Sequence, residues 1–408
     1  MASTNTTSGI DIGRRPPSPT LSIILEIDQS RQALPAELRE KYRDRYAKLL
    51  EEMTKDAGEF VNGNLDTEKH TEDQVRTVIK AFPSALSHPH FSTGFLPIQS
   101  AACFKGAIPF IPLLAIEGGK LEVGGLGKRG GLLREDPTDT DSNLLQQLAN
   151  FGDGDEMDDD AICLDAFKKL RESKLLLKED VRKYQLLFLS CHPSSKERFD
   201  YLVDWDPEAL KTTLFRGNPL IHFSVIYNWG AIESFAMILK AGMKHYPEHL
   251  GFLFRKNTDG ITACEAAFHD YGKDETLKII QECIPADSKY PILHRVIKNA
   301  PQYMDDFAKR YSSAVYLRDE NQRLLLHVAL SSGTNMDNDA MYISSRRDEE
   351  IAERDPITEL YPFAIAASAE TPDLFTIYHL LRRNPSLLGG TDTSKKRKSK
   401  AGKKRKRK

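Results

Sequence analysis

Short apolar boxes built around one central position recur along this chain. The clearest copy reads Leu-Leu-Leu-His-Val-Ala at residues 324–329. Other copies occupy residues 96–101, 184–189, 219–222, 262–267, 291–294 and 361–366. In the later copies the central position recurs at intervals of 35, 43, 29, 33 and 37 residues, at Leu187, His222, Glu265, His294, His327 and Ala364. This period indicates repeated structural units.

A second stretch with helical spacing of its apolar residues follows most boxes. Residues 231–241, 274–283, 302–311 and 372–382 are the examples. Other such stretches end just before Pro83, Pro207 and Pro385, because proline lacks the N–H that continues a helix and disfavours helical backbone in the residue before it. The pattern predicts an all-α fold of antiparallel helix pairs over residues 75–110 and 180–390.

A turn, a box of the type Thr-Pro-Leu-His-x-Ala and a helix pair about every 33 residues resemble the ankyrin repeat. The resemblance is to the degenerate repeats found in large families of algal proteins, and no copy here keeps the whole motif. It implies an ankyrin-like helix-pair solenoid over residues 73–390. It also implies that the box histidines, His222, His294 and His327, tie neighbouring loops by hydrogen bonds. The tetratricopeptide repeat has a similar period, but its Trp-x-x-Leu-Gly-x-x-Tyr pattern does not occur.

Small box residues support close packing between such pairs. A helix pair buries its apolar face only against its neighbours. The small residues Ala101, Ala267, Ala329 and Ala366 allow the first helices to approach closely. We therefore expect these alanines to be buried.

Four segments differ from the array in composition. Residues 1–33 are expected to be a disordered leader, and residues 34–72 a capping region that begins with a charged helix at 34–53. Residues 117–165 are Gly-rich and then acidic, which predicts a mostly mobile, disordered insert with one short helix at 142–149. Residues 391–408 are expected to be a disordered basic tail, because they offer almost nothing apolar to bury.

Composition excludes several classes of protein. The five cysteines are scattered without a Cys-x-x-Cys pair, so we expect reduced, buried thiols and neither a disulfide framework nor a zinc site. No run of about 18 apolar residues occurs, and the N-terminal residues do not resemble a secretory signal. We therefore expect an intracellular protein with no membrane partner.

Charge is distributed unevenly. Residues 390–408 hold eleven Lys or Arg and one acid, so the net charge of −2 for the chain leaves about −12 on the remainder. Two clusters in this tail suit an import carrier or nonspecific binding to nucleic acid: Lys395, Lys396, Arg397, Lys398, Lys403, Lys404, Arg405, Lys406, Arg407 and Lys408. We predict a nuclear protein. The alternative is a cytoplasmic protein whose tail only improves solubility.

Motifs that usually carry chemistry are incomplete. Residues 125–130 match Gly-x-Gly-x-x-Gly but lack the strand and helix of a dinucleotide site, and Glu122 stands where a Walker A loop needs glycine. The acidic run at 153–158 lacks the ligand spacing of an EF-hand. No Gly-x-Ser-x-Gly, His-Glu-x-x-His or kinase signature occurs. We predict a protein that is not an enzyme and uses no cofactor or metal.

The repeats favour a protein-interaction scaffold whose partner binds the repeat surface. The candidate contacts are polar residues of the predicted turns: Arg216, Asn218, Lys256, Asn257, Asp259, Arg318, Asp319, Asn321 and Arg323. The alternative is a nucleic-acid-associated protein whose tail binds phosphates without sequence preference. Salt separates the two, because phosphate binding weakens steeply as salt rises.

Overall fold

The computed structural model describes residues 55–63, 65–90, 92–138, 142–152, 158–214, 217–226, 231–333 and 348–388. Across these ranges the chain is mostly helical, and the only β pairing is in isolated bridges. The predicted all-α class is thus confirmed for these ranges. The predicted leader, the charged helix at 34–53 and the basic tail lie outside them. The chain divides into two compact units, Met1–Thr212 and Thr213–Lys408.

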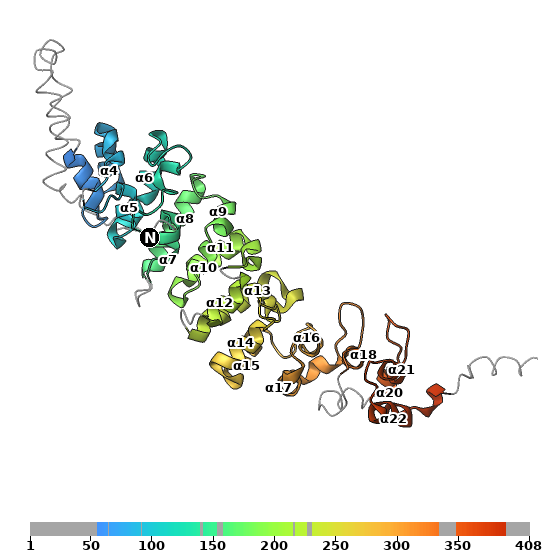
Figure 1. The fold of residues 1–408 in the computed structure, drawn as a ribbon. Coiled ribbons are helices and arrows are strands. Elements are labelled where there is room, and N and C mark those ends of the chain that lie inside the picture. Colours follow the sequence, from blue (N-terminus) through green and yellow to red (C-terminus); the bar gives the residue numbers. More distant parts are fainter. Residues whose placement is uncertain are drawn as a thin grey trace, which may run out of the picture. The chain divides into compact units, whose positions relative to one another are not determined.

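Unit 1 is a set of short helices joined by 3-10 turns (Figure 1). Its α-helices are residues 55–63, α4 (Glu72–Ala81), α5 (Pro97–Ala101), α6 (Ile111–Lys120), α7 (Leu144–Asn150), α8 (Asp158–Glu172), α9 (Lys178–Lys183), α10 (Leu186–Leu189) and α11 (Lys196–Trp205). The 3-10 turns are η1 (Pro83–Ser87), η2 (Lys105–Phe110), η3 (Arg129–Gly131), η4 (Pro193–Ser195) and η5 (Pro207–Lys211). Helix α6 contacts α5 and α8, α8 contacts α11, and α10 contacts α7.

Local sequence sets the ends of these helices. Thr71 caps α4 by accepting a hydrogen bond from the backbone N–H of Gln74, whose side chain accepts from Thr71 in return. The helix ends at Phe82, whose N–H still bonds the carbonyl of Val78, and Pro83 starts η1. The predicted proline stop is therefore confirmed here.

The prediction of a disordered insert at 117–165 is wrong for the described part of that stretch. Helix α7 confirms the short helix expected at 142–149, but the stretch also contains the start of α8, and Leu132, Leu145 and Leu148 are fully buried. The glycines allow a close backbone approach. A Cβ on Gly130, whose φ is +69°, would lie 2.2 Å from the carbonyl oxygen of Ala115 in α6. Glycine at this position allows η3 to pack on α6. A Gly-rich composition alone does not show whether the glycines serve close packing or flexibility.

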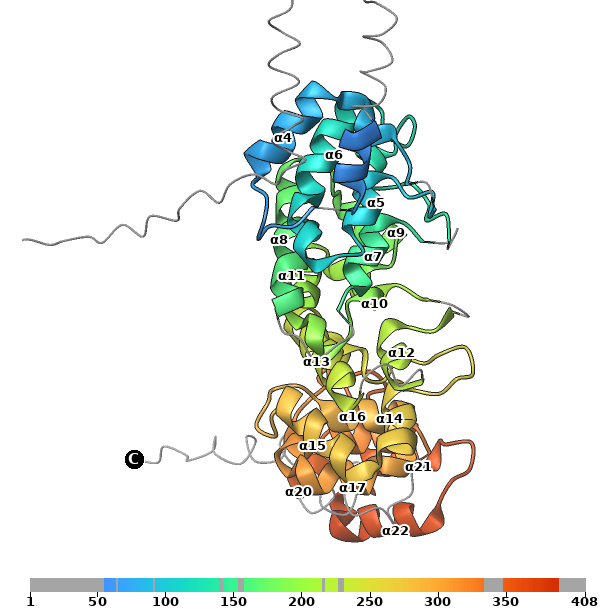
Figure 2. The same cartoon turned by 90° about the vertical axis from the view of Figure 1, so that its left-hand side faces the viewer.

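Unit 2 is built of successive helix pairs (Figure 2). Its helices are α12 (Leu220–Ile226), α13 (Ala231–His245), α14 (Ala263–Tyr271), α15 (Lys273–Cys283), α16 (Ile292–Asn299), α17 (Met304–Arg310), α18 (Leu325–Ser331), α20 (Asp348–Ile351), α21 (Pro362–Ala367) and α22 (Leu374–Arg383). The 3-10 turns η7 (Pro247–Phe252), η8 (Pro301–Tyr303) and η9 (Ser312–Tyr316) connect helices in this unit, and η10 (Pro385–Leu388) follows α22. Helices α12 and α13, α14 and α15, α16 and α17, and α21 and α22 pack as pairs.

The box helices pack on one another, as the small residues predict. Helix α12 contacts α14, and α18 contacts both α16 and α21. Ala267 and Ala329 are fully buried, and Ala101 and Ala366 are also buried. The expectation that these alanines lie in the core is confirmed.

The cysteines fit the expected reduced state with one correction. All five are free thiols, and Cys163, Cys191 and Cys264 are buried. Burial raises the pKa of the Cys191 thiol to about 12, which makes it unreactive. Cys103 is exposed, so the expectation of buried thiols is wrong for this residue.

Candidate partner-binding surface

Short closed loops precede the first helices of unit 2. Isolated antiparallel bridges close residues 213–219, 256–262 and 318–324 at their bases. In the second loop the N–H of Asn257 donates to the carbonyl of Ile261 at 2.9 Å, and in the third Asp319 donates to Arg323 at 3.1 Å. The second and third loops are thus defined structures, and their tips, residues 258–261 and 320–322, are exposed.

The first polar residue of a loop fixes the turn. Oδ1 of Asn257 accepts from the N–H groups two and four residues further along, both at 3.0 Å. Oδ1 of Asp319 accepts from the same relative positions at 3.0 and 2.9 Å. Short carboxylate and amide side chains favour such turns because they satisfy backbone donors locally. These two side chains therefore have a structural role.

The box histidines connect three first helices, α12, α16 and α18, to the backbone of a later segment. Nε2 of His222 donates to the carbonyl of Ile261 at 3.0 Å, and Nε2 of His294 donates to that of Arg323 at 3.2 Å. Nε2 of His327 donates to the carbonyl of Glu353 at 3.1 Å. The role that the ankyrin resemblance implies for these residues, a hydrogen bond to a neighbouring loop, agrees with this geometry.

These bonds require a neutral imidazole with its hydrogen on Nε2. Burial lowers the pKa of His222 and His327, and it lowers the pKa of His294 to about 4. The charged form is disfavoured because the low-dielectric interior solvates it poorly. Above about pH 6.5 all three are neutral in the folded chain and suited to bridging loops, not to proton transfer.

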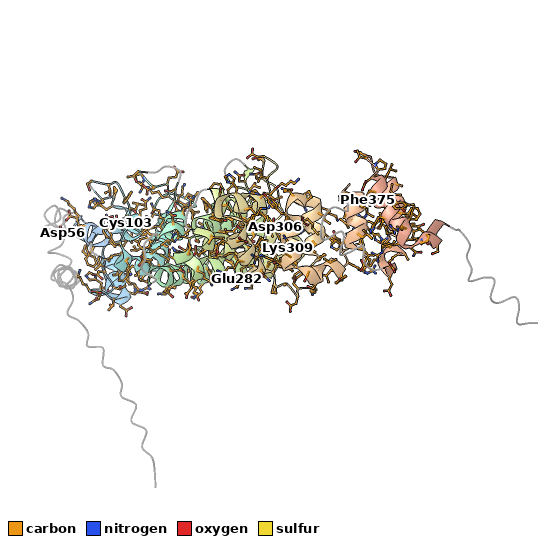
Figure 3. All side chains as sticks on the ribbon, turned by 90° about the horizontal axis from the view of Figure 1, so that it is seen from below. Asp56, Cys103, Glu282, Asp306, Lys309 and Phe375 are labelled. Atoms are coloured by element: carbon orange, nitrogen blue, oxygen red, sulfur yellow. The ribbon has the colours of Figure 1, made fainter. Side chains whose placement is uncertain are left out.

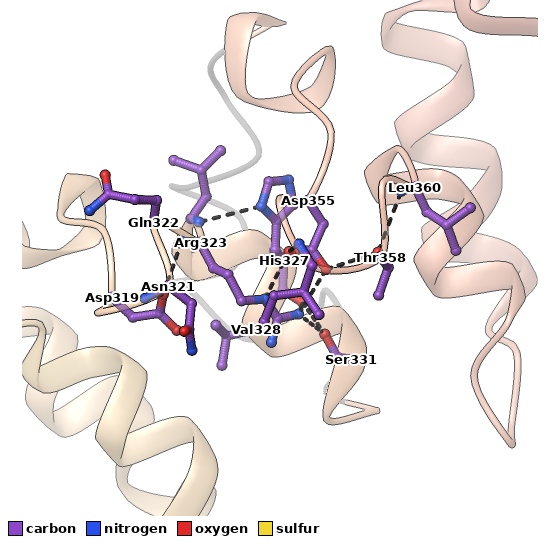
Figure 4. Close-up of polar contacts among 12 residues, drawn as sticks. Asp319, Asn321, Gln322, Arg323, His327, Val328, Ser331, Asp355, Thr358 and Leu360 are labelled. Carbon is purple, nitrogen blue, oxygen red and sulfur yellow. Dashed lines mark hydrogen bonds and ion pairs between the residues drawn. The ribbon is translucent and has the colours of Figure 1, made fainter.

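A buried ion pair closes the last described loops (Figure 4). Nε and Nη2 of Arg323 contact the two carboxylate oxygens of Asp355 at 2.9 and 3.2 Å, and Nη2 also donates to the carbonyl of His327 at 3.1 Å. Burial raises the pKa of Asp355, but hydrogen bonds from Thr358 and Arg323 outweigh it and hold that pKa below its usual value. The charged pair is therefore satisfied within the protein.

Several of the predicted contact residues are buried or bind other groups of the protein. Asn218 and Asp319 are buried, with exposed fractions of 7% and 3%, and Arg323 is committed to Asp355. The expectation of accessible turn residues is thus wrong for Asn218 and Asp319, and for Asp319 the reason is that its carboxylate accepts backbone N–H groups inside the loop. Arg323 is half-buried. Arg318 is exposed but makes a two-pronged ion pair with Glu353.

Other candidates stay accessible. Asp259 and Asn321 are exposed at loop tips, Lys256 is exposed at the base of its loop, and Asn257 is half-buried. Arg216 lies outside the described residues. The structure thus leaves a smaller set of accessible loop residues than the sequence predicts.

A groove of about 350 Å³ lies where three connecting segments meet. It is lined by Pro247, Glu248, Leu250, residues 289–291, Arg295 and residues 318–320. Arg295 is 3.4 Å from Glu320, whereas Lys289 is exposed with no ion pair among the described residues. The groove offers one free ammonium beside the ring of Tyr290 and the pyrrolidine ring of Pro291, a combination that suits an extended peptide with a carboxylate.

Sequence reasoning missed this groove. The predicted contacts contribute only Arg318 and Asp319 to it. The remaining lining comes from the start of η7 at Pro247 and from residues 289–295, which include the box at 291–294. A Tyr-Pro dipeptide at both positions is the available signal.

No family model matches the chain, and neither a curated protein nor a solved structure matches it. Within the described ranges, no group of three His, Cys, Asp or Glu residues is arranged to hold a metal ion. Nor do those ranges contain a helix with the length and apolar character needed to cross a bilayer.

Proposed function

We propose that this chain is a protein-binding scaffold of degenerate ankyrin-like repeats, with its partner site on the loops of unit 2. One observation carries the proposal: the loops 256–262 and 318–324 are closed, locked by Asn257 and Asp319 and tied to box histidines, while their tips remain exposed. Rigid loops lose little entropy on binding, which favours affinity.

The groove beside Lys289 supplies a specific docking point within this surface. An extended acidic segment would place a carboxylate at the Lys289 ammonium and an apolar side chain on Tyr290. Recognition of this kind uses a charge for orientation and an aromatic ring for contact area. The scaffold needs no catalytic group, cofactor or metal for this function.

The test is affinity purification of the full chain and of a Lys289→Glu, Tyr290→Ser variant. Lys278→Glu is the matched control, because it reverses an exposed charge on α15 away from the groove. We expect the variant to lose at least one partner that the parent and the control retain. An unchanged set of partners in all three would contradict the groove as the docking point.

The basic tail is proposed to direct the protein to the nucleus through an import carrier. Its two cationic clusters pair with carboxylates without any need for folding. Replacing the ten Lys and Arg of the clusters with Gln should move a fluorescent fusion to the cytoplasm. A parent fusion that is already cytoplasmic, or a variant that stays nuclear, contradicts this role.

Nucleic-acid binding is the second candidate, favoured by eleven Lys or Arg in residues 390–408. Binding to duplex DNA through this tail would weaken steeply between low and physiological salt and vanish on removal of the tail. A salt-insensitive complex would instead assign binding to the folded units.

A further inference from the structure

The last described box helix, α21, exposes positions that the earlier boxes bury. In six earlier boxes the third residue is at most 2% exposed, and the residue four positions after it is at most 6% exposed. The third residues are Ile98, Leu186, Ile221, Cys264, Leu293 and Leu326. The residues four positions later are Ala102, Ser190, Val225, Phe268, Ile297 and Leu330. In α21 the corresponding Phe363 is half-buried and Ala367 is exposed.

The helix that pairs with α21 shows the same difference. Helices α4, α11, α13, α15, α17 and α22 align on the residue that follows each helix, whose N–H donates to the carbonyl four residues back. Seven positions before that residue, the first five helices carry an apolar side chain that is at most 3% exposed. These residues are Val75, Phe199, Leu239, Leu277 and Met304. The corresponding Ile377 of α22 is only half-buried.

Ile377 belongs to an apolar stripe on α22. Leu374 and Tyr378 are 79% and 64% exposed, and Leu381 is half-buried. Spacings of three, four and seven residues place these four side chains on one side of the helix. Phe375, next to Leu374 in the chain, is 63% exposed and is labelled at the surface of the same helix in Figure 3. We call the following residues the end face: Phe363, Ala367, Leu374, Ile377, Tyr378 and Leu381.

In the earlier pairs of unit 2 the covering surface comes from the chain itself. Helix α12 contacts α14, α16 contacts α18, and α18 contacts α21. Residues 389–408 contain one alanine and no larger apolar residue, so they do not supply an equivalent surface for the end face. An outer face on a helix-pair array is usually polar, because an apolar one associates with other surfaces. The end face therefore suits a contact with another helical surface.

The central box position of α21 favours helices over a loop as the covering surface. Gln99, His294 and His327 at this position each donate to a backbone carbonyl of a later segment. Helix α21 has Ala364 here, which carries no side-chain donor. A surface that covers α21 therefore needs no loop carbonyl at this point, and apolar contact between helices is sufficient.

Charges at the two ends of α22 indicate the direction of that contact. Glu370 is exposed in the turn before α22, and Arg382 is exposed in its last turn. Neither makes an ion pair with another described residue. A covering helix with the same order of charges, running antiparallel to α22, would bring opposite charges together at both ends. A second copy of α22 meets this requirement by two-fold symmetry.

We propose that the end face pairs with the same face of a second copy of the chain, with the two α22 helices antiparallel. The apolar stripes form the centre of the contact, and Glu370 of each copy lies beside Arg382 of the other at its rim. An apolar centre with a charged rim is the usual arrangement of a protein interface. The contact involves neither the loops nor the groove, so it is independent of the proposed partner site.

The first test is sedimentation equilibrium of the purified full chain over a range of concentrations. We expect a reversible monomer–dimer equilibrium. Replacing both Leu374 and Tyr378 with Gln should weaken the dimer at least about tenfold, because it removes apolar contact area from both copies. Lys278→Gln is the matched control, because Lys278 is exposed on α15 at the position aligned with Tyr378, and it should leave the dimer unchanged. Thermal unfolding of the dilute variants should match the parent, since both replaced side chains are exposed.

The second test asks whether the contact joins two equivalent faces. Glu370→Arg alone and Arg382→Glu alone each place like charges together at both ends, so each variant should dimerise at least about tenfold more weakly than the parent. An equal mixture of the two variants should associate again, because every end then pairs opposite charges. A parent that stays monomeric at every concentration, a Gln variant that dimerises like the parent, or a mixture that does not associate would overturn the proposal.

Discussion

In both units a side chain at the central box position makes two hydrogen bonds to the backbone, one at the start of its own helix and one in a later segment. This side chain is an amide in unit 1 and an imidazole in unit 2. In unit 1, Nε2 of Gln99 donates to the carbonyl of Glu135 at 3.0 Å, while Oε1 accepts from the N–H of Leu96 at 3.1 Å. In unit 2, His327 donates from Nε2 at 3.1 Å and accepts at Nδ1 from the N–H three residues before it at 3.3 Å.

The difference shows what the box position requires. At Gln99 and His327 a planar side chain supplies an acceptor facing the start of its own helix and a donor facing a later segment, and an amide or a neutral imidazole can do both. Only the imidazole titrates near neutral pH. We therefore expect equal architecture but unequal response to acid in the two units.

The largest effect we expect is from a charge buried between box helices of unit 2. Ala329→Glu places a carboxylate at a fully buried position and should destabilise the surrounding pairs by about 5 kcal/mol. Hydrogen exchange followed peptide by peptide should show loss of protection in unit 2, whereas unit 1 keeps it. Equal melting of variant and parent would mean that α18 does not pack between its neighbours.

The corresponding destabilising substitution in unit 1 is at Arg198, which is 1% exposed. Nε contacts Oδ1 of Asp160 at 3.1 Å, and Nη2 donates to the carbonyl of Phe151 at 2.9 Å and to Oγ of Ser195 at 2.7 Å. Arg198→Met leaves Asp160 buried without its charge partner, at a cost of about 4 kcal/mol.

Lys168→Met serves as the control, because Lys168 lies on α8 but is exposed. Urea unfolding should separate the two variants clearly. Comparable midpoints would show that the Arg198 pair contributes nothing to unit 1.

Acid should act on unit 2 through its histidines. The folded pKa of His294 is about 4 against an ordinary 6.5, so its contribution is complete above pH 6.5 and is lost as pH falls towards 4. The loss from this residue approaches about 3 kcal/mol. Exchange protection around α16 should fall across that window and be restored in His294→Gln. Identical pH profiles for parent and variant would remove His294 as the cause.

We expect the smallest effect from exchanging the two box side chains, Gln99 for His and His327 for Gln. Gln99→His should cost about 1 kcal/mol at pH 7 and give unit 1 a new loss of stability below pH 6.5, whereas His327→Gln should cost about as much without adding pH dependence. Thermal melts at pH 7 and pH 5 compare the variants. A Gln99→His protein with the parent's pH profile would show that the two positions are not equivalent.

The periodic features were predictable because they repeat. Box alanines such as Ala329 and stops such as Pro83 follow from periodicity and from the missing proline N–H. The burial of Asp319 was not predictable, since a polar residue in a turn serves either the backbone or a partner. Gly130 was misread because close approach to Ala115 depends on a contact that the local sequence does not specify. The groove at Lys289 likewise needs segments distant in sequence.

The protonation of the box histidines tests the account most directly. Long-range ¹H–¹⁵N spectra of the ¹⁵N-histidine-labelled chain, assigned with single His→Gln variants, report the tautomer and the pKa of each ring. Our account predicts that His222, His294 and His327 are neutral with hydrogen on Nε2 at pH 7, and that His294 titrates near pH 4. Titration of all three near pH 6.5 with mixed tautomers would show that they are solvated side chains and that the loops are not tied.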